Sequence, residues 1–307
     1  IGDSLVDRTG TFLDMGAAGG TVALLLRGGT VAVIDGSTGV LRRTLKLSGT
    51  SALACRDGKT ALVVRNNQIG ILELENGGFT PLECAGVERA GGIAVARDGR
   101  IAVIDNGKDS QVKVYAADGK FLYAAGQKGG RPRSGRFEPQ GMMAMSSVAF
   151  DHQGQLWVTE NWEYPRRVSV WGQDGRLVRD YIGNATYAGA QTFLHDTDPD
   201  LAYAAAVEMR LNRADGTFKV ESILWAPDEE RNEAFPLVAH TGHWFPNASF
   251  LVSEASGQPH RYLYFQDDYN AVYMERNGRW QPVAALGFLR NLPRQLREGA
   301  FSSLSPD

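Results

Sequence analysis

The sequence predicts an all-β protein: a single β-propeller of four-stranded antiparallel blades, with six blades favoured and seven as the alternative. A turn that ends in glycine recurs along the chain and each time precedes a strand of alternating apolar and polar residues. These turns end at Gly39, Gly78, Gly119, Gly175, Gly216 and Gly278. Five intervals of 39, 41, 56, 41 and 62 residues separate them, and a repeat near 40 residues with four short strands is typical of a propeller. The 36 glycines suit a protein rich in turns.

The clearest unit runs from Ser146 to Gly183 and reads as four consecutive strands. Apolar residues alternate with polar ones within these strands, which indicates strands with one buried face. The four expected strands are Val148–Asp151, Gln155–Glu160, Arg167–Gly172 and Arg176–Ile182. In this unit we expect Trp157 in the core, Trp162 at the rim, and Gly175 in a positive-φ turn that matches Gly119.

Five further units follow the same plan, in chain order. They are Thr11 to Gly49, Ser51 to Cys84, Gly91 to Gly126, Gln191 to Trp225 and Ala248 to Leu286. Two insertions, 127–145 and 227–247, explain the longer intervals. We therefore expect one propeller domain over residues 1–307. Because the chain opens on Ile1 rather than on methionine, we also expect it to be a processed or truncated piece of a longer chain.

The third and fourth units resemble NHL repeats, and the first two are similar to YncE-like propeller repeats. The NHL resemblance lies in IAVARDGRIAVIDNGKDSQVKVYAADGKFLYAAG (Ile93–Gly126) and VAFDHQGQLWVTENWEYPRRVSVWGQDGRLVRDYIG (Val148–Gly183). The YncE-like resemblance lies in VAVIDGSTGVLRRTLKL. These likenesses imply a propeller fold. They do not imply one activity, since NHL-like propellers include hydrolases, lyases, sensors and scaffolds.

Composition excludes some classes of partner. The chain has 32 basic and 35 acidic residues and a net charge of −3, whereas nucleic-acid binders usually carry a basic excess. The sequence contains no run of about 18 apolar residues, so we expect no transmembrane helix. Cys55 and Cys84 fall on the first and fourth strands of one unit, about 14 Å apart. That separation exceeds the roughly 7 Å that a disulfide allows, so we expect two free, buried thiols.

The histidines raise the possibility of a metal site. His195, His240 and His243 would leave an open coordination position for Zn²⁺ or another divalent metal. The NHL resemblance adds that some NHL-like lyases hold a metal with three histidines. The alternative is that these are hydrogen-bonded loop histidines. The oxygen-rich run from His195 to Asp200 suggests a polar turn rather than a calcium loop, because it lacks the glycine and the distal glutamate of an EF-hand.

Long loops between blades predict a ligand pocket on one rim of the disc. Aromatic rings and a guanidinium suit a sugar or a carboxylated ligand. The expected lining consists of Trp162, Tyr164, Arg166, His195, His240, His243 and Trp244. Either Glu160 or Glu163 could pair with Asp267 or Asp268 as the carboxylates of a glycosidase. The alternative is that Trp162 packs on a neighbouring blade while the charges are solvated.

These patterns predict a binding or scaffold propeller that recognises an extracellular carbohydrate or protein ligand. The alternative is a lyase or hydrolase that acts on a carbohydrate-like substrate at the same face, with or without a metal. We expect a secreted or periplasmic bacterial protein. The insertion with Arg131, Arg133, Arg136 and Glu138 could grip an anion, although a solvated mobile loop is favoured.

Overall fold

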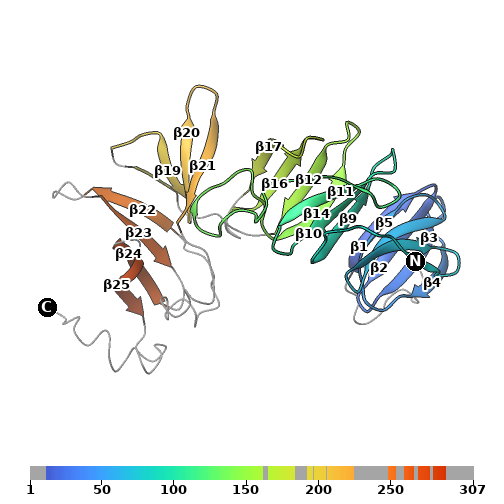
Figure 1. The fold of residues 1–307 in the computed structure, drawn as a ribbon. Coiled ribbons are helices and arrows are strands. Elements are labelled where there is room, and N and C mark those ends of the chain that lie inside the picture. Colours follow the sequence, from blue (N-terminus) through green and yellow to red (C-terminus); the bar gives the residue numbers. More distant parts are fainter. Residues whose placement is uncertain are drawn as a thin grey trace. The chain divides into compact units, whose positions relative to one another are not determined.

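The computed structural model describes residues 12–161, 165–183, 192–195, 197–204, 206–224, 248–253, 259–265, 269–276 and 279–287. Every regular element in these residues is a β-strand (Figure 1), which confirms the all-β prediction. No helix in this part of the chain is long and apolar enough to span a membrane. The chain forms two compact units: unit 1 comprises 1–131, 138–162 and 166–183, and unit 2 comprises 132–137, 163–165 and 184–307.

Unit 1 contains four sheets, each a four-stranded antiparallel meander in chain order. The first sheet contains β1 (Phe12–Ala18), β2 (Thr21–Leu26), β3 (Thr30–Asp35) and β4 (Leu41–Lys46). The second contains β5 (Thr50–Cys55), β6 (Thr60–Arg65), β7 (Gln68–Glu73) and β8 (Phe79–Pro81). The third contains β9 (Ala90–Val95), β10 (Ile101–Asp105), β11 (Gln111–Tyr115) and β12 (Phe121–Ala125). The fourth contains β14 (Met145–Phe150), β15 (Leu156–Glu160), β16 (Arg167–Trp171) and β17 (Leu177–Ile182).

Unit 2 contains two more antiparallel sheets. The fifth sheet contains β18 (Thr192–Leu194), β19 (Leu201–Ala204), β20 (Val207–Asn212) and β21 (Thr217–Ile223). The sixth contains β22 (Ala248–Ser253), β23 (Pro259–Phe265), β24 (Tyr269–Arg276) and β25 (Arg279–Gly287). A two-residue strand from the first insertion, β13 (Gly135–Arg136), pairs with β21 and adds a fifth strand to the fifth sheet.

The six sheets coincide with the six units expected from the sequence, so the repeat assignment is confirmed. The turns between the third and fourth strands also match. Gly119 has φ of 91° and Gly175 has φ of 77°, as predicted for equivalent turns. The number of blades in a closed ring, and a single domain over 1–307, stay predictions.

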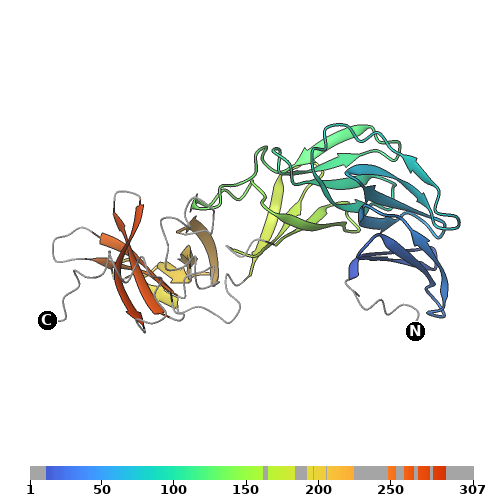
Figure 2. The same cartoon turned by 90° about the horizontal axis from the view of Figure 1, so that it is seen from below.

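In unit 1 the first strand of each sheet lies beside the first strand of the next. Figure 2 shows the four sheets following one another in chain order, from blue to yellow-green, and β1, β5, β9 and β14 are successive neighbours. Gly16 permits the approach of β1 to β5, because a Cβ there would lie 2.5 Å from the Cys55 nitrogen. The inner strands therefore form one continuous lining.

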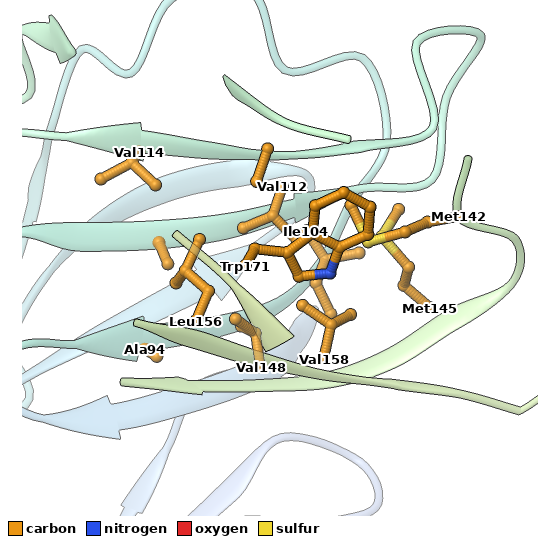
Figure 3. Close-up of a cluster of buried hydrophobic side chains, with 12 residues drawn as sticks. Ala94, Ile104, Val112, Val114, Met142, Met145, Val148, Leu156, Val158 and Trp171 are labelled. Atoms are coloured by element: carbon orange, nitrogen blue, oxygen red, sulfur yellow. The ribbon is translucent and has the colours of Figure 1, made fainter. Parts of the chain in front are cut away.

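Apolar side chains fill the space between neighbouring sheets. Between the third and fourth sheets, the buried Trp171 indole lies among Ile104, Val112 and Val158 (Figure 3). The alternation along β15 places Leu156 and Val158 in this core and turns Trp157 to the opposite face. Trp157 is 37% exposed, so the prediction that it belongs to the core is wrong.

Both cysteines are free, as predicted. They are half-buried rather than fully buried. Desolvation raises the pKa of each thiol to about 11, so neither is poised as a thiolate nucleophile at neutral pH.

Candidate functional site

The first strands of unit 1 share a β-bulge at equivalent positions. In each sheet the bulge lies near the start of the first strand, opposite the end of the second strand. Leu13, Ser51 and Ser146 are extra residues in β1, β5 and β14, each inserted where the pairing register shifts. In β9 two residues, Gly91 and Gly92, stand opposite the single Ile104. Such bulges re-aim side chains and leave backbone groups without a ladder partner.

These strands line an open-sided cavity of about 700 Å³ in unit 1. Its walls come from β1, β5, β9 and β14, and all the bulge residues line it. Most of the lining residues are glycine, alanine or serine, so side chains do not fill the space. Within unit 1, the cavity therefore has space for a ligand.

The lining has a marked charge character. Asp14 is the one carboxylate among the described residues that line the cavity, and these residues include no lysine, arginine or histidine. Asp14 Oδ2 accepts a hydrogen bond from the Leu53 N–H at 2.8 Å, and Oδ1 accepts one from the Met15 N–H at 2.8 Å. Burial raises the pKa of Asp14, and the two N–H donors offset that effect only in part.

Hydroxyl and apolar groups complete the walls. Ser51, Ser146 and Ser147 are exposed, and Ser146 Oγ lies 2.9 Å from Thr159 Oγ1. On β1, Leu13 and Met15 are exposed by 43% and 57%. Most of the exposed surface of the cavity is polar, so the cavity offers mainly hydrogen-bonding groups.

Glu160, considered above as a glycosidase carboxylate, is a buried structural residue. Its Oε2 accepts from Arg131 Nε, Arg131 Nη2 and the Met143 N–H at 3.0–3.1 Å. Its Oε1 accepts from Arg167 Nη1 at 3.1 Å. Arg131, Glu160 and Arg167 side chains are fully buried. The glycosidase role for Glu160 is therefore wrong, because its carboxylate is fully buried between two guanidinium groups, where a substrate cannot reach it.

The expectation of a solvated insertion is wrong for Arg131, which is buried, whereas Arg133 and Arg136 are exposed. Burial lowers the pKa of its guanidinium, against the attraction of Glu160. Arg167 donates to the carbonyl oxygens of Gly141 and Pro139 at 2.9 and 2.5 Å. The bonds of Arg131 connect the start of the first insertion to the fourth sheet, and the bonds of Arg167 connect its end to the same sheet.

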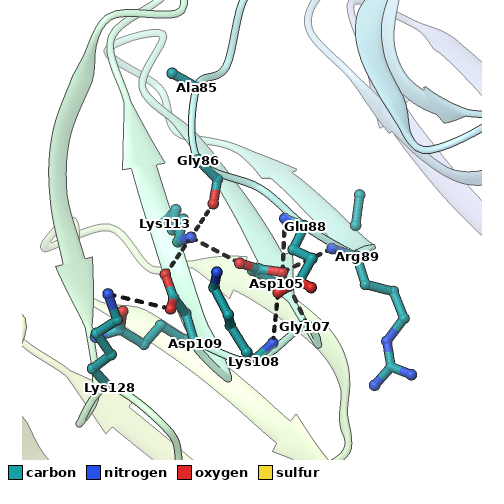
Figure 4. Close-up of polar contacts among 12 residues, drawn as sticks. Ala85, Gly86, Glu88, Arg89, Asp105, Gly107, Lys108, Asp109, Lys113 and Lys128 are labelled. Carbon is teal, nitrogen blue, oxygen red and sulfur yellow. Dashed lines mark hydrogen bonds and ion pairs between the residues drawn. The ribbon is translucent and has the colours of Figure 1, made fainter.

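An equivalent carboxylate lies in the third sheet (Figure 4). Asp105 is the last residue of β10, just as Glu160 is the last residue of β15. The Asp105 carboxylate accepts a hydrogen bond from Lys113 Nζ at 2.8 Å. It also accepts hydrogen bonds from three backbone N–H groups, those of Glu88, Arg89 and Gly107. Burial alone would raise the pKa of Asp105, but these donors outweigh it and hold the pKa below its usual value. Both buried carboxylates bind the connection that enters their own sheet, and both are structural.

Of the residues predicted to form the rim pocket, two are described. Arg166 is exposed and belongs to unit 1, and His195 is half-buried and belongs to unit 2. Trp162, Tyr164, His240, His243 and Trp244 lie outside the described residues. The rim pocket and the three-histidine metal site therefore stay predictions.

The surroundings of His195 restrict how it could bind a metal. Its Nδ1 accepts from the N–H groups of Thr197 and Asp198 at 3.2 and 3.0 Å, so a metal would have to approach Nε2. Asp198 and Asp200 form ion pairs with Arg210 and Arg213 at 2.6 and 2.8 Å. This favours the polar turn over a calcium loop. Across the described ranges, no group of three or more His, Cys, Asp or Glu side chains is arranged to hold a metal.

Comparison with known proteins does not assign a family. No protein-family model and no curated protein matches the sequence, so membership of the NHL or YncE-like families stays a prediction. Among solved structures, the chain is similar to a protein of unknown function from Bacteroides caccae. The identity is 16%, the TM-score is 0.40, and the match covers 64% of this chain and 71% of that one. So distant a likeness carries no inference about function.

The cavity was not anticipated from the sequence, although a signal for it exists. Small residues occur in pairs or triplets where three of the first strands begin: Thr50-Ser51-Ala52, Gly91-Gly92 and Ser146-Ser147. Their alignment becomes meaningful only once the units are superposed as blades. The bulges themselves depend on pairing register, which period-two patterns do not reveal.

Proposed function

We propose that this protein is a binding module that holds its ligand in the cavity between the inner strands of unit 1. The observation that carries the proposal is the row of bulges at equivalent positions in β1, β5, β9 and β14. Bulges are over-represented beside functional sites. Four at one level of a single lining point to a common purpose beyond the packing of each sheet.

The size of the cavity supports binding. Ligand sites usually have volumes of about 300–1,000 Å³, and this cavity measures about 700 Å³. The bulges lie at the end of the sheets that also carries the loops between second and third strands. There the N–H groups of Asn66, Asn106 and Asn161 donate to carbonyls of the connections at 2.9–3.0 Å. Arg166, one of the predicted rim residues, belongs to such a loop, between β15 and β16, whereas His195 lies between β18 and β19, the first and second strands of the fifth sheet.

The chemistry of the cavity favours binding over catalysis. A glycosidase needs two carboxyl groups facing the scissile bond, and the described lining offers Asp14 alone. Asp14 is committed to two backbone N–H groups. The Cys55 thiol lines the same space but, with a pKa of about 11, stays protonated at neutral pH. The proposal therefore takes a carbohydrate or protein ligand, recognised without conversion.

Filling the cavity tests this proposal. Ser51→Trp places an indole on an exposed bulge residue and should weaken binding by at least about a hundredfold, because a filled cavity cannot accept the ligand. Ala117→Trp, at an exposed turn residue that does not line the cavity, is the matched control. The ligand would first be found by thermal-shift screening of glycan and peptide libraries, and the dissociation constants then measured by calorimetry.

Equal affinity of the wild-type protein and Ser51→Trp would overturn the proposal, provided that the variant keeps the wild-type unfolding temperature. Ser146→Trp provides an independent second variant in case Ser51→Trp fails to fold. A ligand bound equally by both Trp variants binds elsewhere on the protein.

A further inference from the structure

We propose that the ligand of the inner-strand cavity is an uncharged, polyhydroxylated molecule of oligosaccharide size, and that Asp14 selects it by accepting hydrogen bonds from ligand hydroxyls. This inference rests on the proposed function and goes beyond it, since it chooses one ligand chemistry and one specificity-determining residue.

The charges of the residues that line the cavity disfavour an acidic ligand. The described lining contains no cationic side chain and one carboxylate. A ligand carboxylate or phosphate would lose its hydration there without gaining a charged partner, and it would be repelled by Asp14. Phosphorylated ligands, uronic acids and acidic peptides therefore do not fit the site.

Asp14 also fits an uncharged ligand better than a cationic one. Its carboxylate is half-buried beside β5 and is anchored by the N–H groups of Leu53 and Met15. Each oxygen accepts one N–H, which leaves about one further acceptor position per oxygen. Two such positions on one fixed carboxylate suit a pair of neighbouring hydroxyl groups, whereas a single anchored carboxylate makes a weak site for a cation.

The remaining walls supply what a sugar requires. Ser51 and Ser147 are exposed hydroxyl residues that can both donate and accept. The bulged backbone adds N–H and C=O groups that lack ladder partners. The exposed surface of the cavity is predominantly polar, which suits a ligand whose surface consists largely of hydroxyl groups. A cavity of about 700 Å³ has room for more than one sugar ring.

The experiment uses the full chain and a defined panel of soluble saccharides. The uncharged members are cello-, xylo-, manno- and malto-oligosaccharides, the acidic members are oligogalacturonates, and the cationic members are aminoglycosides, which carry several positive charges at neutral pH. We expect at least one uncharged member to bind and the charged members to bind far more weakly. Calorimetry at neutral pH measures the dissociation constants.

Asp14→Asn is the diagnostic variant. It keeps one side-chain oxygen for the Leu53 N–H but removes the charged acceptor, so affinity should fall by roughly tenfold to a hundredfold. Asp118→Asn is the matched control, because Asp118 also accepts a backbone N–H, from Lys120 at 3.0 Å, in an exposed turn away from the cavity. Its affinity should equal that of the wild-type protein. If Asp14→Asn fails to fold, Ser147→Ala tests the same wall and should weaken binding severalfold.

The outcomes separate this inference from the proposed function. Preferred binding of an acidic or cationic saccharide, or of a peptide, that Ser51→Trp abolishes would overturn the inference and leave the proposed function standing. Binding of an uncharged saccharide that Ser51→Trp leaves intact would overturn the proposed function itself. Binding to no uncharged member of the panel, or equal affinity of Asp14→Asn and the wild-type protein, would also overturn the inference.

Discussion

At the scale of single residues, the third and fourth sheets each depend on a buried carboxylate at the end of the second strand. Asp105 neutralises Lys113, and Glu160 binds Arg131 and Arg167, with Asp180 as a second acceptor for Arg167 at 3.1 Å. Each carboxylate also accepts backbone N–H groups from the connection that precedes its sheet. A buried charge is stable only when all of its ion-pair and hydrogen-bond partners are present. Removing one of these partners should therefore destabilise the whole sheet.

Glu160→Gln is expected to destabilise the protein by about 3–5 kcal/mol, because it removes the charged carboxylate that the buried guanidinium groups of Arg131 and Arg167 share. Asp98→Asn is the control: the Asp98 side chain is 55% exposed in its ion pair with Arg100, and this pair should contribute less than about 1 kcal/mol. Urea unfolding followed by fluorescence measures both values. A loss for Glu160→Gln no larger than for Asp98→Asn would contradict the structural role.

The buried position of Glu160 was within reach of the sequence, and so was the error over Trp157. Leu156 and Val158 point inward along β15, so Glu160 must share their face and Trp157 must oppose it. The prediction for Trp157 gave more weight to the size of the indole than to the alternation. In fact its ring stacks on Tyr181 with centroids 5.8 Å apart, and its Nε1 donates to Asp151.

At the scale of elements, the turns between third and fourth strands were predictable because glycine at positive φ is a local requirement. Bulges, and the pairing of β13 with β21, were not, since both depend on a partner strand distant in sequence. The first four units could thus be delimited closely, while the cavity that their first strands line could not be foreseen. The rim residues were proposed from loop composition, which says little about where a side chain points.

Gly175→Ala and Gly39→Ala separate backbone strain from close packing. Both glycines have positive φ, 77° and 72°, so alanine should cost about 1–2 kcal/mol at either position. A Cβ at Gly175 would also lie 2.3 Å from the Ala124 carbonyl oxygen, whereas nothing lies within 4 Å at Gly39. We expect Gly175→Ala to be the more destabilising by about 2 kcal/mol, measured by urea unfolding. Equal losses would show that packing at this turn is looser than described.

At the scale of the molecule, side-chain amides join successive sheets of unit 1. Asn67 follows β6, accepts from the Ala90 N–H at 2.7 Å and donates to the Glu88 carbonyl at 2.9 Å. Asn106 follows β10, accepts from the Met145 N–H at 3.1 Å and donates to the Met145 carbonyl at 2.8 Å. Each amide replaces the backbone partners that the start of an inner strand would otherwise lack. The sheets of unit 1 are therefore joined by hydrogen bonds as well as by apolar packing, at the same end that carries the bulges.

This arrangement predicts that Asn106→Ala will loosen two sheets at once. Met145 would lose the partners of its N–H and C=O, which should cost about 1–3 kcal/mol. Amide hydrogen exchange should accelerate at Met145 and in neighbouring residues of β14 as well as at the end of β10, because both ends of the amide bridge are released. Asn76→Ala is the control, since the Asn76 side chain accepts only from the Gly78 N–H in an exposed turn of one sheet. Faster exchange confined to the 105–111 loop, with β14 unchanged, would mean that apolar packing alone holds the third and fourth sheets together.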